Sequence, residues 1–495
     1  MAGESHARLL AGTAAALSLS ACALGPDFHR PSLTTPEQYL PTGHAHRTVE
    51  AEGVSQRFKE SAPVASRWWA DFHAPALDDL EDRGQRESPT LASAEAALRQ
   101  SEAQLQAGAG VFYPSLGVNA AAYREHGSTA APGQSRTLGT YSLYSLSGAI
   151  SYPLDIFGGE RRGVEALAAS RDASRHRRDA AVVTLQANIA AAAIAAAGYR
   201  EEARRLNDLI TDQRSELEVL RVRNAAGPDA YAVVLSAQTA LAASEAELPV
   251  LQQREGAAET LLAVLVGAAP GAWDGSGLEF STLKVPDALP LTLPSTLVRK
   301  RPDILAAEAA LHAANAEIGV ATAEMFPSLT LSGASGFENT ATSALFGAAS
   351  RTWSLGPSLA APVFEGGTLR ARRRAAVAAR DQALADYRTV VLAAFQQVSD
   401  TLRALGHDAE VEAASESGWK SAEALNRLGR IQEDAGLISP LDRLALDVQL
   451  RQAQVQLIEA KAQRLQDTVA LYAALGGGFT PDAAAAPSPQ AGDQR

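Results

Sequence analysis

The sequence predicts a mostly α-helical protein with a small β part, in which one unit of helix, hairpin, long helix and returning helix occurs twice. Three observations lead to this prediction. The second half of the chain repeats the first at a nearly constant offset, each half holds one very long helical stretch, and each holds a pair of segments in which apolar and polar residues alternate as in β-strands. Two copies are too few for a solenoid, so we expect one pseudo-symmetric pair of units.

The chain begins with the features of an export signal. A polar start is followed by residues 9–19, which are apolar or small and uncharged, and then by small residues before Cys22. Leu19-Ser20-Ala21-Cys22 resembles the bacterial lipobox, which implies that residues 1–21 are removed and that Cys22 carries a covalent thioether-linked lipid. Cys22 is the only cysteine, so no disulfide framework accounts for it. An ordinary signal with a cysteine at its cleavage site is the alternative. Residue 23 is alanine rather than the aspartate that would indicate retention in the inner membrane, so the resemblance favours the outer membrane.

The internal repeat extends over most of the chain. Residues 89–98 parallel residues 302–311 at an offset of 213 positions, and further along Gly227 corresponds to Gly436 at an offset of 209. Chance does not readily produce so constant an offset, even in alanine-rich helices. The predicted order is an N-terminal lipid-anchored segment (22–86), repeat 1 (87–267), a linker rich in glycine and proline (268–298), repeat 2 (299–476) and a disordered tail (477–495).

Each repeat contains a long helix and a returning helix. The long helices are predicted at about residues 162–224 and 369–434, each on the order of 95–100 Å long. Gly227 and Gly436 mark the turns that follow, because glycine is favoured just past a helix end. Residues 189–197 (IAAAAIAAA) have small side chains almost all round, which permits close packing on two sides, as in a wall of helices. A soluble antiparallel coiled coil is the alternative.

Before its long helix, each repeat contains a predicted β-hairpin, at about residues 111–153 and 325–362. In the second hairpin Trp353, Leu355 and Leu359 alternate with small and polar residues. Segments of about 9–12 residues with this alternation are typical of tilted strands that have lipid on one side and water on the other. Two soluble hairpins are the alternative.

Proline marks every predicted passage between strand and helix. Proline removes a backbone donor and fixes φ, so it suits the end of a strand. Beyond the signal we expect no apolar run long enough for a transmembrane helix, so a membrane crossing requires a closed barrel. Four strands do not close around a water channel, which means that several chains must contribute strands. The four prolines are Pro114, Pro153, Pro327 and Pro362.

Composition and motifs argue against several classes of function. The formal net charge is −12, and two arginine-rich runs in the long helices lack interleaved aromatic residues, so a nucleic-acid binder is not expected. His44 and His46 have no third ligand nearby, so no metal site is predicted. The sequence contains neither a Gly-x-Ser-x-Gly nucleophile motif nor a phosphate-binding loop. We expect a protein that is not an enzyme and has no cofactor apart from the lipid on Cys22.

Motifs along the chain together resemble those of the TolC/OprM-like family of outer membrane factors, particularly its lipoprotein (NodT-type) branch. No single motif is decisive, but their order and spacing are specific over about residues 19–478. In chain order they are Cys22 with Gly25-Pro26-Asp27-Phe28-His29-Arg30-Pro31, Trp68-Trp69-Ala70-Asp71-Phe72, Arg301-Pro302-Asp303-Ile304, Phe326-Pro327-Ser328-Leu329, Pro362-Val363-Phe364-Glu365-Gly366-Gly367 and Ala435-Gly436-Leu437-Ile438-Ser439.

This resemblance implies a homotrimer with a twelve-stranded β-barrel in the outer membrane, continued by a long α-helical barrel in the periplasm. Residues 22–86 and 268–298 would lie around the equator of the helical barrel. The implied function is an exit duct for drugs or other small molecules, joined by a periplasmic adaptor (membrane fusion protein) to an inner-membrane pump of the RND type. Two alternatives stay open: an outer-membrane duct for protein secretion, and a lipid-anchored periplasmic coiled-coil scaffold.

In that family, acidic residues at the helix turns furthest from the membrane ring the axis and constrict the pore. The matching position here is Asp442, and the position that matches a second ring, one helical turn later, is Ala445. The sequence therefore departs from a double acidic ring. Asp442 can equally be a helix-start carboxylate stabilised by the helix dipole. The turn glycines Gly227 and Gly436 are the expected sites of adaptor contact.

Overall fold

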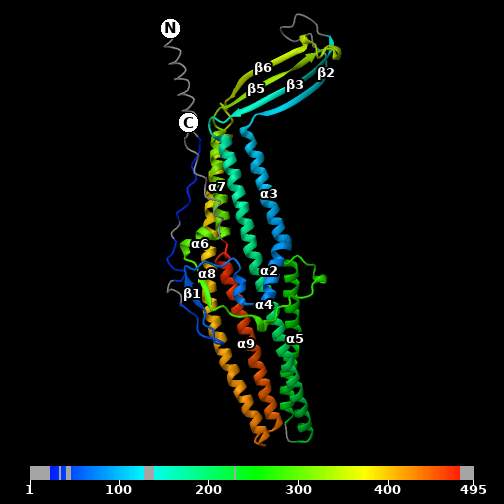
Figure 1. Ribbon diagram of the computed structural model, residues 1–495, viewed down its shortest axis with the longest axis vertical. Helices are drawn as coiled ribbons and strands as arrows, with labels where there is room; N and C mark the ends of the chain where they lie inside the picture. The colour runs from blue at the N-terminus through cyan, green and yellow to red at the C-terminus, as the bar shows by residue number, and fades with distance from the viewer. Residues whose placement is uncertain (1–22, 33–34, 41–45, 127–138, 228–229, 480–495) are drawn as a thin grey trace. The chain divides into compact units, whose positions relative to one another are not determined.

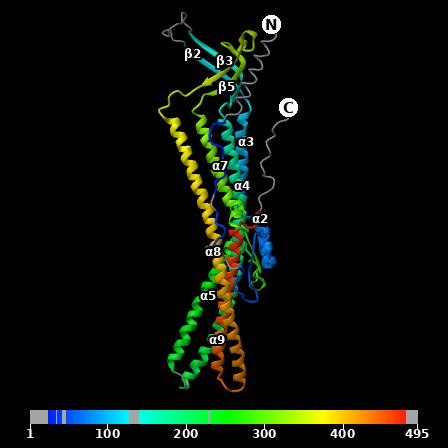
Figure 2. The same ribbon diagram turned by 90° about the vertical axis from the view of Figure 1, so that its left-hand side faces the viewer.

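The computed structural model describes residues 23–32, 35–40, 46–126, 139–227 and 230–479. The chain forms two compact units. Figures 1 and 2 show its helices and strands. Of the described residues, unit 1 contains those up to residue 31 and those in 98–174 and 307–387. Unit 2 contains residues 32–97, 175–306 and those from 388 onward.

Helices and strands occur in the same order in the two repeats. The long helices α4 and α8 each contain 67 residues, and the returning helices α5 and α9 each contain 35. The predicted mostly helical, duplicated architecture is therefore confirmed. Repeat 1 contains α3 (Pro89–Ala109), β2 (Ser115–His126), β3 (Thr140–Leu154), α4 (Gly159–Ala225) and α5 (Tyr231–Leu265); repeat 2 contains α7 (Pro302–Ala323), β5 (Ser328–Asn339), β6 (Arg351–Ala360), α8 (Thr368–Asp434) and α9 (Pro440–Ala474).

The remaining elements lie before, between and within the repeats. In unit 2, β1 pairs with β4 in parallel, which joins the N-terminal segment to the linker between the repeats. These elements are β1 (Arg57–Glu60), η2 (Trp68–Phe72), α2 (Pro75–Glu87), η3 (Gly110–Phe112), η4 (Pro270–Ala272), η5 (Phe280–Thr282), β4 (Ala288–Leu291), α6 (Pro294–Lys300), η6 (Thr342–Ala344) and η7 (Ala348–Ser350).

The start of α4 differs from the prediction for a local reason. α4 begins at Gly159 rather than at residue 162. The carboxylate of Asp155 accepts hydrogen bonds from the backbone N–H groups of Glu160 (3.1 Å) and Arg161 (3.0 Å). These N–H groups have no partner inside a helix, so the carboxylate supplies one and extends the helix by a turn.

In unit 1 the four long strands form one antiparallel sheet in the order β2-β3-β5-β6 (Figure 1). Residues 144–154 of β3 pair with residues 329–339 of β5, so the sheet joins the two repeats. β2 and β6 are the edge strands. Within the described residues, each of them has a neighbouring strand on one side only.

The two faces of this sheet differ in chemistry. On one face, two rows of the register begin and end with large apolar side chains on the edge strands, and these four residues are 70–79% exposed: Leu116 and Leu355 in one row, Val118 and Trp353 in the other. The neighbouring row on the opposite face consists of small residues, Ser115, Ser151, Ser332 and Gly356. The sheet thus presents one apolar face and one small, polar face.

One prediction about helix composition is wrong. Within the described residues, α4 contains an 18-residue window with a mean hydropathy of 1.8, which meets the length and composition of a membrane span. Half of that window is buried inside the protein. The alanine-rich stretch of α4 supplies much of the core, and Ile189, Ala193 and Ile194 have no exposed surface. Such burial is typical of a core helix.

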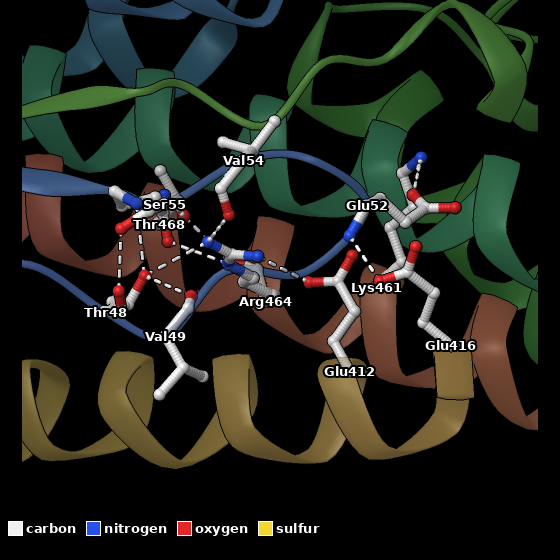
Figure 3. Close-up of polar contacts among 11 residues, drawn as sticks. Thr48, Val49, Glu52, Val54, Ser55, Glu412, Glu416, Lys461, Arg464 and Thr468 are labelled. Carbon is white, nitrogen blue, oxygen red and sulfur yellow. Dashed lines mark hydrogen bonds and ion pairs between the residues drawn. The ribbon is translucent and has the colours of Figure 1, made fainter. Parts of the chain in front are cut away.

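A buried ion pair fastens the N-terminal segment to α8 and α9 (Figure 3). The Arg464 side chain of α9 has no exposed surface and pairs with Glu412 of α8 at 2.8 Å. It also donates to the Gln56 side-chain oxygen at 2.9 Å and to the Val54 carbonyl at 3.3 Å. A buried guanidinium needs several hydrogen-bond acceptors. Glu412 of α8 provides one, and the N-terminal segment provides others.

Residues of two sequence motifs, 68–72 and 301–304, contact the C-terminal end of α9. The Trp68 ring stacks on Tyr472 with centroids 4.9 Å apart, and the Tyr472 hydroxyl donates to the Asp71 carboxylate at 2.6 Å. Arg301 donates to the Ala474 carbonyl at 2.9 Å. Carbonyls in the last turn lack partners inside the helix, so Arg301 caps α9.

Candidate functional site

The segment that follows Cys22 is anchored in unit 1, although Cys22 itself lies outside the described residues. The Leu24 backbone N–H donates to the Phe157 carbonyl at 3.0 Å, in the connection between β3 and α4. Gly25 has a φ of +99°, and a Cβ there would lie 2.4 Å from Cα of Gly319 on α7. Only glycine fits so close an approach of two backbones. The chain is therefore held at the junction of sheet and helices two residues after Cys22.

Side-chain contacts hold the rest of this motif. Asp27 forms an ion pair with the largely buried Arg162 of α4 at 2.7 Å. The hydrogen bond and the charge of Arg162 hold the pKa of Asp27 below its usual range. Phe28 stacks on His312 of α7, with ring centroids 4.4 Å apart. The motif thus binds the start of the described chain to both α4 and α7.

The four predicted prolines all lie close to strand ends. Pro114 and Pro327 immediately precede β2 and β5, while Pro362 follows the end of β6 by two residues. Pro153 is the penultimate residue of β3 and lies opposite Thr330 of β5. The positions fit the missing backbone donor of proline, because ladder hydrogen bonds end there.

Apolar side chains at the same strand ends are strongly exposed, and the sequence does not predict this exposure. Val363 and Phe364, between β6 and α8, are 95% and 88% exposed. Tyr113 and Phe112, just before β2, are 73% and 40% exposed. Connecting loops are usually polar, so a valine and a phenylalanine close to two glycines in such a loop could have indicated this exposed apolar site.

A turn that contains glycine follows each of the long helices α4 and α8, and both turns lie at the same end of unit 2 (Figure 2). After α4, the Gly227 N–H donates to the Asn224 carbonyl at 3.0 Å. After α8, the N–H groups of Gly436 and Leu437 donate to the carbonyls of Glu433 and Gln432, each at 2.8 Å. This is the Schellman pattern, and the φ of +72° at Gly436 is the left-handed conformation that it requires.

Asp442 forms a capping box at the start of α9. Its N–H donates to Ser439 Oγ at 3.2 Å, and the Ser439 N–H donates to Asp442 Oδ2 at 3.0 Å. The Ser439 hydroxyl also donates to Asp442 Oδ2 at 2.7 Å. This bond, the bond from the Ser439 N–H and the charge of Arg223 hold the pKa of Asp442 below its usual range. The helix-start interpretation is therefore observed, and the carboxylate is also exposed and ionised near neutral pH. Ala445, one turn later, is exposed as well.

An apolar cluster fixes the two turns relative to each other. The cluster lies between α4 and α5, and Leu441 and Val448 of α9 pack against it. Arg451 of α9 pairs with Asp212 of α4 at 3.2 Å. Gly227, Gly436 and Asp442 therefore belong to one packed end of unit 2.

Comparison with known proteins agrees with this architecture. The family described as outer membrane efflux protein matches residues 82–268 and 293–477. The pyoverdine export outer membrane protein OpmQ of Pseudomonas aeruginosa is 31% identical over 94% of this chain and 96% of its own length. The probable efflux pump outer membrane protein TtgC of Pseudomonas putida is 28% identical over 95% of this chain and 96% of its own length.

Solved structures give the same result. The outer-membrane channel OprN has a TM-score of 0.81 and 28% identity, and the match covers 93% of this chain and 100% of that one. The two stretches that match the family run from α2 to just past α5 and from before α6 to just past α9, so each contains one repeat. The chain therefore belongs to the outer membrane efflux protein family.

Proposed function

We propose that this protein is the outer-membrane channel of a tripartite efflux system, through which small molecules leave the cell. The single observation that carries the proposal is the sheet of unit 1, which has an exposed apolar face, a small polar face and two open edges. In lipid an open edge leaves backbone groups without partners, so the sheet must close. Three copies would form a twelve-stranded barrel with the apolar face toward lipid and a water-filled interior.

The lipid on Cys22 is part of this proposal. The described chain is bound to the β3–α4 connection two residues after Cys22, where the strands end. A thioether-linked lipid at that place would enter the inner leaflet of the membrane that the strands cross. Its acyl chains would add to the membrane attachment that the barrel already provides.

The helix turns are proposed as the periplasmic end of the duct. Gly227 and Gly436 lie at the tips, where a periplasmic adaptor would bind and couple the channel to an inner-membrane pump of the RND type. Asp442 from each copy would face the axis and favour cations. Relatives named for efflux and for pyoverdine export support a small-molecule cargo rather than a secreted protein.

Electrophoresis and planar-bilayer recordings of the detergent-purified protein test the proposal. We expect a trimer in dodecyl sulfate that dissociates on boiling, and a mostly closed, cation-preferring conductance. Asp442→Asn should reduce the cation preference, whereas Asp434→Asn, an exposed carboxylate at the end of α8, should not. A monomer without conductance would contradict the channel. Unchanged selectivity in Asp442→Asn would contradict only the role of that residue.

A further inference from the structure

The exposed apolar residues at the strand ends form two separate patches. The first consists of Phe112 and Tyr113, just before edge strand β2, and the second of Val363 and Phe364, just after edge strand β6. We call them the entry patch and the exit patch. Such large apolar side chains, exposed to this degree beside an open edge, commonly mark an interaction surface.

The directions of the strands bring these patches together when the open edges pair. β2 starts at Ser115 and β6 ends at Ala360, so both patches lie at the same end of the sheet, where α3 precedes the strands and α8 follows them. Pairing of β6 with β2 of a second copy continues the antiparallel pattern of the sheet. The residue after the end of one strand then lies beside the residue before the start of the other.

The register inside the sheet defines the stagger between copies that this placement requires. Ser115 shares a row with Gly356, four positions before the end of β6. Closing a barrel requires the strands to tilt and the register to stagger from copy to copy. A stagger that brings strand ends to one level moves Ser115 of the second copy past Ala360, which places Tyr113 next to the exit patch.

We propose that at each interface between copies the exit patch of one chain packs against the entry patch of the next, forming an apolar contact that locks the barrel to the helices below it. The proposal rests on the proposed function, because it requires a barrel shared among copies. The occupant is a second copy of this chain, since the two patches flank the two edges that must meet. Aromatic rings bury a large area with few rotatable bonds, which suits a lock between subunits.

Cysteine cross-linking tests the contact directly. Tyr113→Cys and Phe364→Cys are combined in one chain, and isolated outer membranes are treated with an oxidant or a short bismaleimide. The matched control combines Tyr113→Cys with Phe346→Cys, an equally apolar position that is 67% exposed in the β5–β6 connection. The wild-type chain, whose only cysteine is Cys22, supplies the baseline. Non-reducing gels and native mass measurements are the readouts.

We expect covalent dimers and trimers from the Tyr113/Phe364 pair, at least about tenfold above either single variant and the control pair, and reversible by reductant for the disulfide. A wild-type trimer by native mass whose Tyr113/Phe364 variant gives no cross-link would overturn the contact and leave the channel intact. A monomeric wild type would overturn both. Quenching of a label on Phe364→Cys by lipid-borne nitroxides, without cross-links, would assign the exit patch to the membrane instead.

Discussion

At the scale of single residues, unit 2 contains buried ionisable groups that affect its stability. Arg464 and Glu412 form an ion pair with at most 1% of either side chain exposed. Glu81 lies on the buried face of α2, with Leu77 and Gly84, and its carboxyl has no hydrogen-bond partner within the described part of the chain. Burial raises the pKa of Glu81 to about 9. These groups make stability sensitive to substitution and to pH.

Glu81 makes the protein less stable as pH rises. The folded protein keeps the proton up to about pH 9, whereas an unfolded glutamate releases it near 4.5. Stability therefore falls between these values, by up to about 1.4 kcal/mol per pH unit. Glu81→Gln removes this dependence, so its melting temperature relative to wild type should be higher at pH 8 than at pH 5. Thermal melts at both values, with the exposed Asp79→Asn as control, check this. Equal differences at both pH values would contradict the prediction.

Removing Arg464 should be strongly destabilising, because it leaves the Glu412 carboxylate buried without its counter-ion. Breaking a buried pair on one side costs about 3–5 kcal/mol, whereas replacing both partners by apolar residues is far milder. We expect Arg464→Ala to lower the denaturant midpoint, and Arg464→Met combined with Glu412→Leu to recover most of it. Arg403→Ala, at an exposed site on α8, is the control. If the double variant lowers the denaturant midpoint as much as Arg464→Ala does, the ion pair itself stabilises the fold.

At the scale of elements, the turns after the long helices have fixed backbone requirements. Gly436 at the end of α8 has a φ of +72°, where a residue with a Cβ is strained. Gly418, in contrast, lies inside α8 with open space around it. Alanine is therefore expected to have opposite effects at Gly418, inside α8, and at Gly436, just past its end.

Gly436→Ala should destabilise the α8–α9 hairpin by about 1–2 kcal/mol, since the left-handed conformation is unfavourable for alanine. Gly436→Asn should destabilise the hairpin less, because asparagine tolerates the left-handed conformation. Gly418→Ala should gain up to about 1 kcal/mol from helix propensity. Amide hydrogen exchange in the last turn of α8 and the first turn of α9 measures the effect. Faster exchange in Gly418→Ala than in Gly436→Ala would contradict the turn geometry.

The sequence was most informative where structure is local and repeated. The offset between Gly227 and Gly436 predicted the two hairpins of helices, because a glycine after a helix has a direct conformational meaning. The Arg464 site could not be predicted from the sequence, because its partner Gln56 is 408 positions away. Contacts at such separation depend on how the helices pack. The sequence motif that contains Val363 and Phe364 did not predict that both are exposed, because the exposure of a residue is a property of the fold.

At the scale of the whole molecule, the sheet has two chemically different faces and, in the part of the chain that the structure describes, two open edges. Leu355 projects from the apolar face of β6 and is 70% exposed, while its neighbour Ser354 belongs to the opposite face. Alternate residues of a strand point to opposite sides, so the two positions test which face meets lipid.

Leu355→Arg should prevent assembly in the outer membrane, because arginine on the lipid face costs about 2–4 kcal/mol near the middle of the bilayer. Ser354→Arg places the same charge on the face proposed to line water, so it should assemble. The amount of heat-dissociable trimer in outer-membrane fractions measures both. Normal assembly of Leu355→Arg together with failure of Ser354→Arg would reverse the orientation of the sheet.

The pairing of β3 with β5 has a consequence for biogenesis. Ile150 and Gly333 face each other across the seam between the repeats, and all of α4, α5 and α7 separates them in the chain. A polypeptide emerging into the periplasm must keep its first hairpin unpaired until the second has been exported, and closing so large a loop is slow. During that interval the apolar face of the first hairpin is exposed and promotes aggregation. A holdase-type chaperone would therefore be most needed before the second repeat has been exported.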